Sequence, residues 1–515
     1  SEGGVMAAPP RRGSGTYDEL HRRDGEVGKA LVAKGLGPGD RVGVLMANRP
    51  EYLSALFGIA AAGCVVVALN TFSTAEELRY QIELSGISLL LFDTRVAKQD
   101  FAAMLGQIDL PAALDQLVEL DSVTDDLPVR GGFATWQDFL AGGAGVADAE
   151  IARRSSRVTP DDTGGIFFSS GTTSLPKGVV HSQKAFAIQW WRWPRVFAMR
   201  EPVRSWTGNG LFWSGNVSMA LGTALSTGGA VILQPVFSAA GALDAIEHER
   251  VSFLAGRPHQ WARVQAEPRW QSADLSSLKY VTKGDLITEH PSVTTDWVMP
   301  NAFGTTETMT ICTAFDADAQ PHVYAGSVGA PLPGNVLKII DPTTREIVPV
   351  GTSGEMCIKG PTLMSGYLGK AAAECFDADG FYCTGDGGHV DAAGRFFWEG
   401  RLTALIKSGG ANVSPEEVDA AIAEYPGVKR SQTVGVADEL LGERVVACVV
   451  PVEGAVIEQA ALIAFLRDRL AAFKCPKDVV LLAEADFAMT ANEKPVIAEI
   501  RKTAEARIRA QTRQV

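Results

Sequence analysis

The feature that most constrains this chain is a segment rich in hydroxyl groups that follows an apolar stretch. Residues 166–178 read IFFSSGTTSLPKG. Small residues let backbone N–H groups approach an oxyanion, the hydroxyls add donors, and Lys177 adds positive charge. Pro176 and Gly178 depart from the Walker A pattern, which requires Gly and then Ser or Thr there. The segment predicts a phosphate-binding turn at a strand end and disfavours a P-loop kinase, although the composition alone is also typical of a connecting loop.

Alternating helical and strand patterns place this turn in an α/β fold. With 515 residues, the chain is expected to form three or four structural units. Helical and strand patterns alternate through residues 18–92 and again through residues 164–285, which predicts βαβ units on parallel sheets. Short strands with Pro and Gly turns at residues 326–358 indicate a small β-barrel subdomain. We predict a large N-terminal domain (residues 1–400), a hinge (401–405) and a small, mobile α+β domain (406–515), whose first helix is capped by Ser414.

Composition excludes several classes of function. The net charge of −13 disfavours nucleic-acid binding, which requires a basic face. The seven Cys are scattered without CxxC spacing, which predicts reduced thiols in a cytoplasmic protein and no Cys or His metal site. The longest apolar runs are too short to span a bilayer. The sequence does not decide the oligomeric state, and a homodimer is one of the open alternatives.

Further motifs follow the phosphate turn in a fixed order. They are NAFGTTET at residues 301–308, YCTGD at 382–386, Gly400 with Arg401, and AMTANEKP at 488–495. The turn resembles the [ST]SGTTGxPKG signature of the adenylate-forming superfamily, which includes acyl-CoA synthetases, peptide-synthetase adenylation domains and luciferases. The later motifs are similar to that family's aromatic-Gly-x-Thr-Glu, TGD, GR and PxTxxGK motifs. The chain is identified as a member, in the acyl-CoA synthetase branch, over nearly its whole length.

The resemblance implies a site for ATP, Mg²⁺ and coenzyme A. Phe303 would stack on adenine, Thr306 would donate to the α-phosphate, and Glu307 would hold Mg²⁺. Asp386 would accept from the ribose hydroxyls, and Lys494 would be the catalytic lysine. The implied catalytic residues are Lys494, Thr306, Glu307 and Lys177, and the implied ATP-binding residues are Ser169, Ser170, Gly171, Thr172, Thr173, Lys177, Gly284, Asp285, Ala302, Phe303, Gly304, Thr305, Thr306, Asp386, Arg401 and Lys494.

The resemblance also implies two half-reactions: a carboxylate and ATP give an acyl-AMP, and a thiol then takes the acyl group. Between them the small domain turns about a hinge at Thr403 and brings in the turn Lys407, Ser408, Gly409 and Gly410, which lines the coenzyme A tunnel. The chain departs from the family's pattern at Ser174, Asp285, Thr403, Ala488 and Glu493.

Aromatic residues suggest the acyl group. Trp213 lies where acyl-CoA ligases place a gate between the acyl pocket and the thiol tunnel, although a buried core Trp fits the pattern equally. Trp190, Trp191, Ala302 and Met309 are the other expected walls, which favours an apolar carboxylic acid, either aromatic, alicyclic or aliphatic. Two alternatives stay open: an adenylation enzyme that loads a carrier-protein thiol, and a nucleotide-binding homologue without catalysis.

Overall fold

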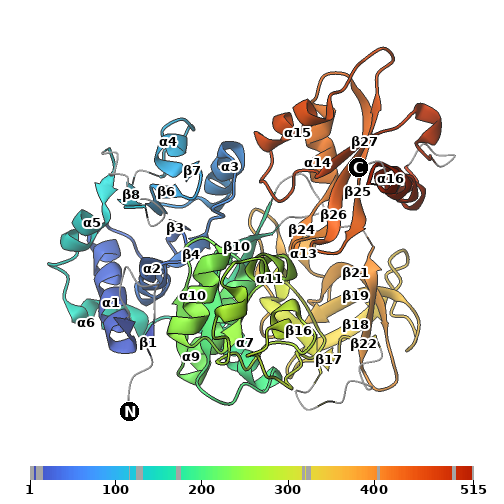
Figure 1. Cartoon of the computed structure of the whole chain (residues 1–515). Helices are drawn as coiled ribbons and strands as arrows, with labels where there is room; N and C mark the ends of the chain where they lie inside the picture. The colour runs from blue at the N-terminus through green and yellow to red at the C-terminus, as the bar shows by residue number, and fades with distance from the viewer. Residues whose placement is uncertain are drawn as a thin grey trace.

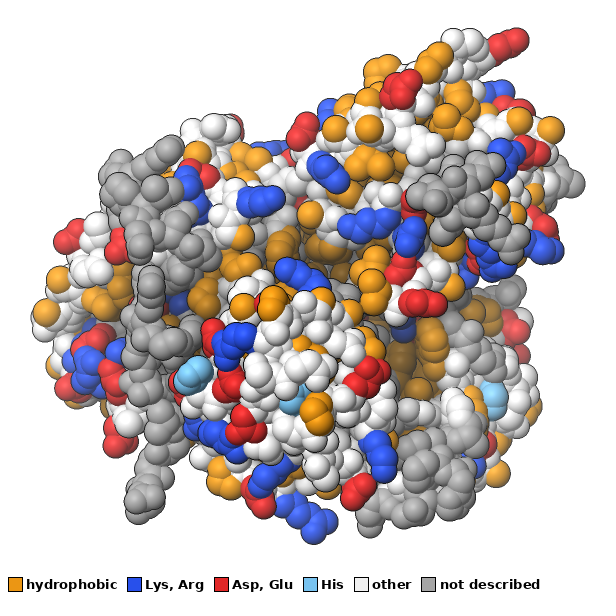
Figure 2. Space-filling model, viewed as in Figure 1, with side chains coloured by type: hydrophobic (Ala, Val, Ile, Leu, Met, Phe, Trp, Pro, Cys, Tyr) orange, Lys and Arg blue, Asp and Glu red, His pale blue; other side chains and the backbone are white. Residues whose placement is uncertain are grey.

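The computed structural model describes residues 5–6, 15–114, 116–122, 132–169, 176–315, 319, 326–402, 406–489 and 495–512. A larger body holds the described residues up to 402, and a smaller body holds those from 406 onward and lies against one side of it (Figure 1). Figure 2 shows this face hollowed where the two bodies meet, with hydrophobic side chains in the hollow and Lys and Arg side chains around it. Among the described helices, none is long and apolar enough to cross a membrane.

An eight-stranded sheet forms the centre of the first half of the chain. Its order is β20-β11-β10-β4-β3-β5-β8-β9, and the run from β10 to β9 is parallel. The predicted alternation is confirmed: β3 (Arg41–Leu45), α2 (Pro50–Ala61), β4 (Val65–Ala68), α3 (Ala75–Ser85) and β5 (Leu89–Asp93) follow one another. The remaining strands are β8 (Gln116–Leu120), β9 (Ala134–Thr135), β10 (Thr163–Ser169), β11 (Lys177–Ser182) and β20 (Gly366–Tyr367).

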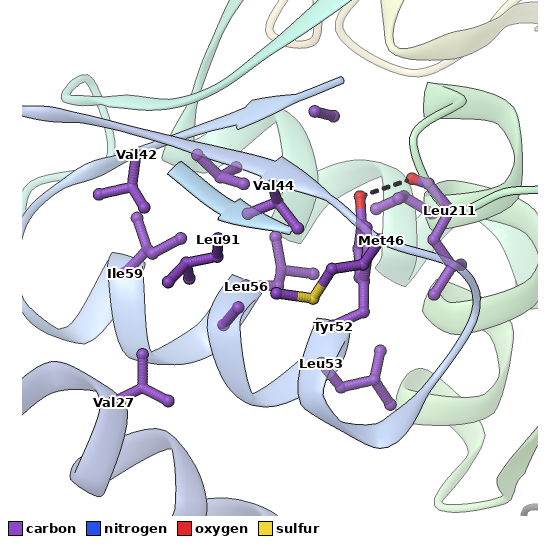
Figure 3. Packing of buried hydrophobic residues seen from close by; sticks show 14 of the residues in the cluster. Val27, Val42, Val44, Met46, Tyr52, Leu53, Leu56, Ile59, Leu91 and Leu211 are labelled. Atoms are coloured by element: carbon purple, nitrogen blue, oxygen red, sulfur yellow. Dashed lines mark hydrogen bonds between the residues drawn. The ribbon is translucent and has the colours of Figure 1, made fainter. Parts of the chain in front are cut away.

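The central strands β10, β4, β3 and β5 are buried on both faces, as parallel strands covered by helices require. Val42, Val44 and Leu91 point toward α2, where Leu56 and Ile59 meet them (Figure 3). A second core cluster fills the opposite face of the same strands. Tyr52 of α2 is fully buried, and its hydroxyl donates to the Leu211 carbonyl at 3.0 Å, which joins this core to the next unit.

A second, parallel sheet has the order β13-β12-β14, with β12 (Arg204–Thr207) between β13 (Ala230–Leu233) and β14 (Phe253–Leu254). The helices α1 (Tyr17–Ala33), α7 (Gln183–Val196), α9 (Gly222–Thr227), α10 (Ala239–Glu249) and α11 (Pro258–Gln265) belong to these two units. Adjacent parallel strands joined by helices again match the predicted βαβ pattern.

The β-rich part consists of antiparallel sheets. One contains β15 (Ala302–Thr305), β16 (Thr310–Ala314) and β17 (Ala330–Pro331). The other runs β18-β19-β21-β22, namely Val336–Ile340, Gly354–Lys359, Tyr382–Val390 and Phe396–Arg401. In place of the predicted barrel, the structure shows antiparallel sheets. The described strands of the second sheet follow the order β18-β19-β21-β22, without pairing between β18 and β22.

One prediction about the cysteines is wrong. Cys357 of β19 and Cys383 of β21 stand opposite each other in the ladder and form a disulfide, although all the thiols were expected to be reduced. The pairing depends on strand register, which the scattered spacing does not reveal. The other five Cys are free and buried.

The smaller body has the α+β pattern predicted for it. It contains β23 (Ile406–Ser408), β24 (Ala411–Val413), β25 (Val428–Asp438), β26 (Gly442–Pro451) and β27 (Asp478–Leu481), with α14 (Pro415–Ala423), α15 (Gln459–Arg467) and α16 (Ile497–Thr512). Ser414 caps α14, since its hydroxyl accepts from the Glu417 N–H at 3.3 Å. β22 and β23 belong to different sheets. The exact hinge stays a prediction, because residues 403–405, Thr403 included, lie outside the described part.

Candidate active site

The predicted phosphate turn is held at both ends by one hairpin. β10 ends at Ser169 and β11 begins at Lys177, and these two residues are partners in the ladder. The Ser169 hydroxyl is buried and has no hydrogen-bond partner among the described residues, which suits an oxygen-rich ligand. Ser170, Gly171, Thr172 and Thr173 lie outside the described residues, as does Ser174.

Lys177 and Glu307, which are far apart in sequence, meet at Tyr367. The Tyr367 hydroxyl donates to Glu307 Oε1 at 2.8 Å, and the Lys177 ammonium lies 5.2 Å from the centre of the Tyr367 ring. Burial, together with the charge of Glu307, raises the pKa of Tyr367, so it remains a donor. Its oxygen lies 2.9 Å from the Tyr382 hydroxyl, which then donates to it. The end of the phosphate turn and the Glu307 motif therefore both contact Tyr367, Lys177 over its ring and Glu307 at its hydroxyl.

Tight packing holds the backbone of this motif. β15 carries Ala302, Phe303, Gly304 and Thr305, and a short 3-10 turn, Thr306–Thr308, follows. A Cβ atom on Gly304 would lie 1.7 Å from the Thr310 carbonyl oxygen, so only glycine fits there. The Phe303 ring packs edge-on against Phe396 of β22, at 5.7 Å between centroids.

His181 of β11 contacts the backbone of the same motif. Its Nε2 lies 2.8 Å from the Thr306 carbonyl. Burial lowers the pKa of His181 to about 4, and the hydrogen bond to Thr306 opposes that shift. The ring is therefore neutral near pH 7, with Nε2 as its N–H donor.

Acid is expected to weaken the fold through His181. The folded pKa, about 4, lies below the unfolded value of ~6.5, so the unfolded chain binds more protons between these limits. The contribution of the neutral His181 to the free energy of unfolding is fully present above ~pH 6.5. As the pH falls toward 4, up to about 3 kcal/mol of that free energy is lost. Calorimetric melting from pH 7.5 to 4.5 should show a steeper fall for the wild type than for His181→Gln, which keeps a donor but does not titrate. Parallel profiles would contradict this role.

The two predicted ribose motifs lie opposite each other. Asp386 of β21 pairs with Arg401 of β22, so the TGD and GR motifs lie side by side on neighbouring strands. The side chain of Arg401 is outside the described part. Asp386 is 1% exposed, and its Oδ1 accepts from the Trp398 indole N–H at 2.9 Å. A buried carboxylate held by an indole is fixed in direction, as recognition of two neighbouring hydroxyls requires.

Gly284 and Asp285 form a separate turn before the 3-10 segment Leu286–Glu289. Gly284 has a positive φ of 99° and donates to the Thr288 hydroxyl, which in turn donates to the Asp285 carbonyl. These contacts are local. Their role at adenine therefore stays a prediction.

Of the residues expected around the acyl group, several gather in one hydrophobic cluster. Met309 is fully buried in the cluster that also holds Leu211 and Phe212, and Trp190 and Trp213 pack against it. Ala302 packs against the neighbouring cluster around Trp193.

Trp191 does not join these residues. It is 55% exposed, and Arg195 stacks over its ring at 4.3 Å. Adjacent residues on a helix point in different directions, so Trp190 faces inward and Trp191 outward. The expected place of Trp191 in the pocket wall is therefore wrong.

The turn predicted to line the thiol route lies against the larger body. Gly409 and Gly410 have positive φ angles of 58° and 82°, and a Cβ on Gly410 would lie 2.5 Å from Arg257 Nε. The Lys407 ammonium lies 4.0 Å from the centre of the Trp398 ring, the same indole that holds Asp386. Ser408 is buried in β23. Lys494 lies outside the described residues.

Sequence reasoning missed Tyr367, His181 and Trp398. His181 had a readable signal, since it is a polar residue in the otherwise apolar strand GVVH that follows the phosphate turn. Tyr367 and Trp398 had none, because their contacts join segments separated by 60 and 12 residues.

The fold consists of a large α/β domain followed by a small α+β domain. The chain belongs to the AMP-binding enzyme family, in the acyl-CoA synthetase branch of the adenylate-forming superfamily: it matches that family over residues 7–368, and the AMP-binding enzyme C-terminal domain over residues 417–494. Membership of this branch makes it an AMP-forming ligase.

Individual proteins agree with this assignment. The chain is 33% identical over 474 residues to an indoleacetate–CoA ligase of Aromatoleum aromaticum, covering 91% of this chain and 89% of that protein. It is 33% identical over 478 residues to a feruloyl-CoA synthase of Amycolatopsis sp., covering 90% and 89%. Among solved structures, the amide bond synthetase McbA from Marinactinospora thermotolerans has a TM-score of 0.79 at 26% identity over 97% of each chain. ATP-bound MatB from Rhodopseudomonas palustris has a TM-score of 0.64 at 26% identity over 98% and 97%.

Proposed function

We propose that this protein is an ATP-dependent carboxylate–CoA ligase. In the first half-reaction a carboxylate oxygen attacks the α-phosphorus of ATP, and pyrophosphate leaves, giving an acyl-AMP. In the second, the sulfur of coenzyme A attacks the acyl carbon, and AMP leaves with the electron pair of the broken bond. The observation that carries the proposal is the meeting of Lys177 and Glu307 at Tyr367, which couples the phosphate turn to the motif proposed to hold the nucleotide.

The described residues favour charge neutralisation and positioning over covalent catalysis. Lys177 supplies positive charge beside the phosphate turn, and Thr306 supplies a hydroxyl. Glu307 suits Mg²⁺, because carboxylate oxygens are its preferred protein ligands and Tyr367 fixes the direction of this one. Bound there, Mg²⁺ would neutralise charge on the phosphates of ATP. Asp386 and its strand partner Arg401 hold the ribose.

The apolar cluster supports a substrate that carries a ring. Trp190, Trp213 and Met309 share one cluster, and aromatic walls favour flat or compact apolar groups. The named relatives act on indoleacetate, on ferulate and, in Mycobacterium tuberculosis at 32% identity, on a propanoate attached to a dioxo-octahydroindene ring system. We infer that the substrate is an aromatic or alicyclic carboxylate and that its ring binds against this cluster.

A panel assay tests both parts of the proposal. The protein is incubated with ATP, Mg²⁺ and individual carboxylic acids, with and without coenzyme A, and pyrophosphate, acyl-AMP and acyl-CoA are measured. Ring-bearing acids are expected to give pyrophosphate and, with coenzyme A, the thioester. Failure of every acid to release pyrophosphate would support the alternative of a nucleotide-binding protein without catalysis. Release with straight-chain acids alone would contradict the substrate assignment.

A carrier-protein thiol is the second candidate acceptor. A fatty acid–[acyl-carrier-protein] ligase, ScoC of Streptomyces coeruleorubidus, is 30% identical over 90% of this chain. Acyl-AMP that accumulates with free coenzyme A but is consumed by a phosphopantetheinylated carrier protein would favour this acceptor.

A further inference from the structure

A buried cluster of three charges joins the two bodies of the molecule. Lys474, between α15 and β27, donates to Glu77 Oε1 at 2.9 Å and to Glu417 Oε1 at 2.6 Å. Glu77 lies on α3 of the larger body and Glu417 on α14 of the smaller one, and all three side chains are at most 7% exposed. Figure 1 shows α3 facing α14 and α15 where the bodies approach each other.

Such a buried charge cluster contributes more to the choice of one domain orientation than to the net stability of the protein. Removing charged groups from water is costly, and their attraction offsets that cost only when every partner is in place. If the smaller body turned away, Glu77 would separate from Lys474, and water would reach these groups. An orientation that kept Glu77 buried without Lys474 would leave an uncompensated charge. The contact therefore favours one orientation of the smaller body over nearby alternatives.

The neighbouring contacts show which orientation is favoured. Phe473, adjacent to Lys474, packs edge-on against Trp213 of the apolar cluster, at 6.0 Å between centroids. The Gly410 turn lies against Arg257, and Lys407 lies over Trp398. The same docking that buries Lys474 thus brings the proposed thiol-route turn beside the Asp386 side of the site.

We propose that Lys474 is a positioning residue whose contact with Glu77 holds the smaller domain in the arrangement for thiol transfer, so that it sets the rate of the second half-reaction and not the first. This rests on the proposed function. The family resemblance implies that adenylation uses Lys494 and not this docked arrangement, so we expect it not to depend on the Lys474–Glu77 contact.

Glu77→Gln is the sharpest variant, because Glu77 also accepts from the Thr74 N–H in the capping box of α3. Glutamine retains the acceptor for the cap and removes the charge that Lys474 needs. Glu76→Gln, exposed in the same helical turn, is the matched control. Lys474→Met removes the charge from the other side while keeping a long unbranched side chain.

The two half-reactions are measured separately, as carboxylate-dependent ATP–pyrophosphate exchange and as thioester formation from supplied acyl-AMP and coenzyme A. Glu77→Gln and Lys474→Met are expected to slow the second about 10- to 100-fold and to change the first less than about twofold, and the double variant should lose little more than either alone. The control should match the wild type in both. Equal slowing of both half-reactions, or no change in either, would overturn the proposal.

A readout without catalysis separates this proposal from the proposed function. Hydrogen exchange of the unliganded proteins is followed in α3 and in residues 470–477. Faster exchange in both segments of Glu77→Gln, with the control unchanged, supports the contact even if the wild type activates none of the acids. Exchange identical to that of the wild type would overturn the contact in solution, whatever the activity.

Discussion

Replacing Lys494 with alanine is expected to slow carboxylate-dependent adenylation about 10²–10³-fold and to leave thioester formation from supplied acyl-AMP nearly intact. The first half-reaction brings an anionic carboxylate against the α-phosphate, and a positioned cation offsets the charge that develops there. Loss of one such donor typically costs about 10²–10³ in rate. The second half-reaction starts from an acyl-AMP whose leaving group is already in place, so it does not need this cation.

The described structure gives a physical reason for the separation. Met489 and Pro495, which flank the segment of Lys494, pair with each other, and Met489 packs against the core of the smaller domain. The residues of the smaller domain that contact Trp398 and Arg257 are instead those of the turn at Lys407–Gly410. Different parts of the smaller domain would thus serve the two steps.

The comparison uses the same two half-reaction assays, with Lys502→Ala as the matched control, because Lys502 is an exposed lysine of the smaller domain. Pyrophosphate exchange should fall about 10²–10³-fold in Lys494→Ala and remain unchanged in the control. An equal fall in both half-reactions would show that Lys494 serves the whole fold or both steps, and would contradict the division proposed here.

Local patterns made most of the fold predictable. Apolar runs such as residues 41–46 and 65–69 are strands because both faces of a parallel sheet are buried, and the structure places β3 and β4 there. Ser414 followed by Pro415 specified the start of α14 through capping chemistry that acts within one turn. These features depend on neighbours in sequence, which a single chain reveals.

Contacts between distant segments were not predictable in the same way. The cross-strand pairing of Cys357 with Cys383 requires the register of β19 and β21. The approach of Tyr367 to Glu307 requires β20 to pair with β11, which no local pattern indicates. The motifs predicted that a nucleotide site exists, whereas the side chains that orient it came from the tertiary structure.

Asp386→Asn is expected to raise the KM for ATP about 10²-fold with a much smaller change in KM for the carboxylate. The Trp398 indole N–H must keep an oxygen as its acceptor, so the amide of the variant is forced to turn its NH₂ toward the ribose. Two charge-assisted hydrogen bonds from the ribose hydroxyls would then face a donor, and each such bond contributes about 1.5–3 kcal/mol. Asp379→Asn, on the exposed loop before β21, is the control. Circular dichroism verifies the fold, and an unchanged KM for ATP would mean that the ribose binds elsewhere.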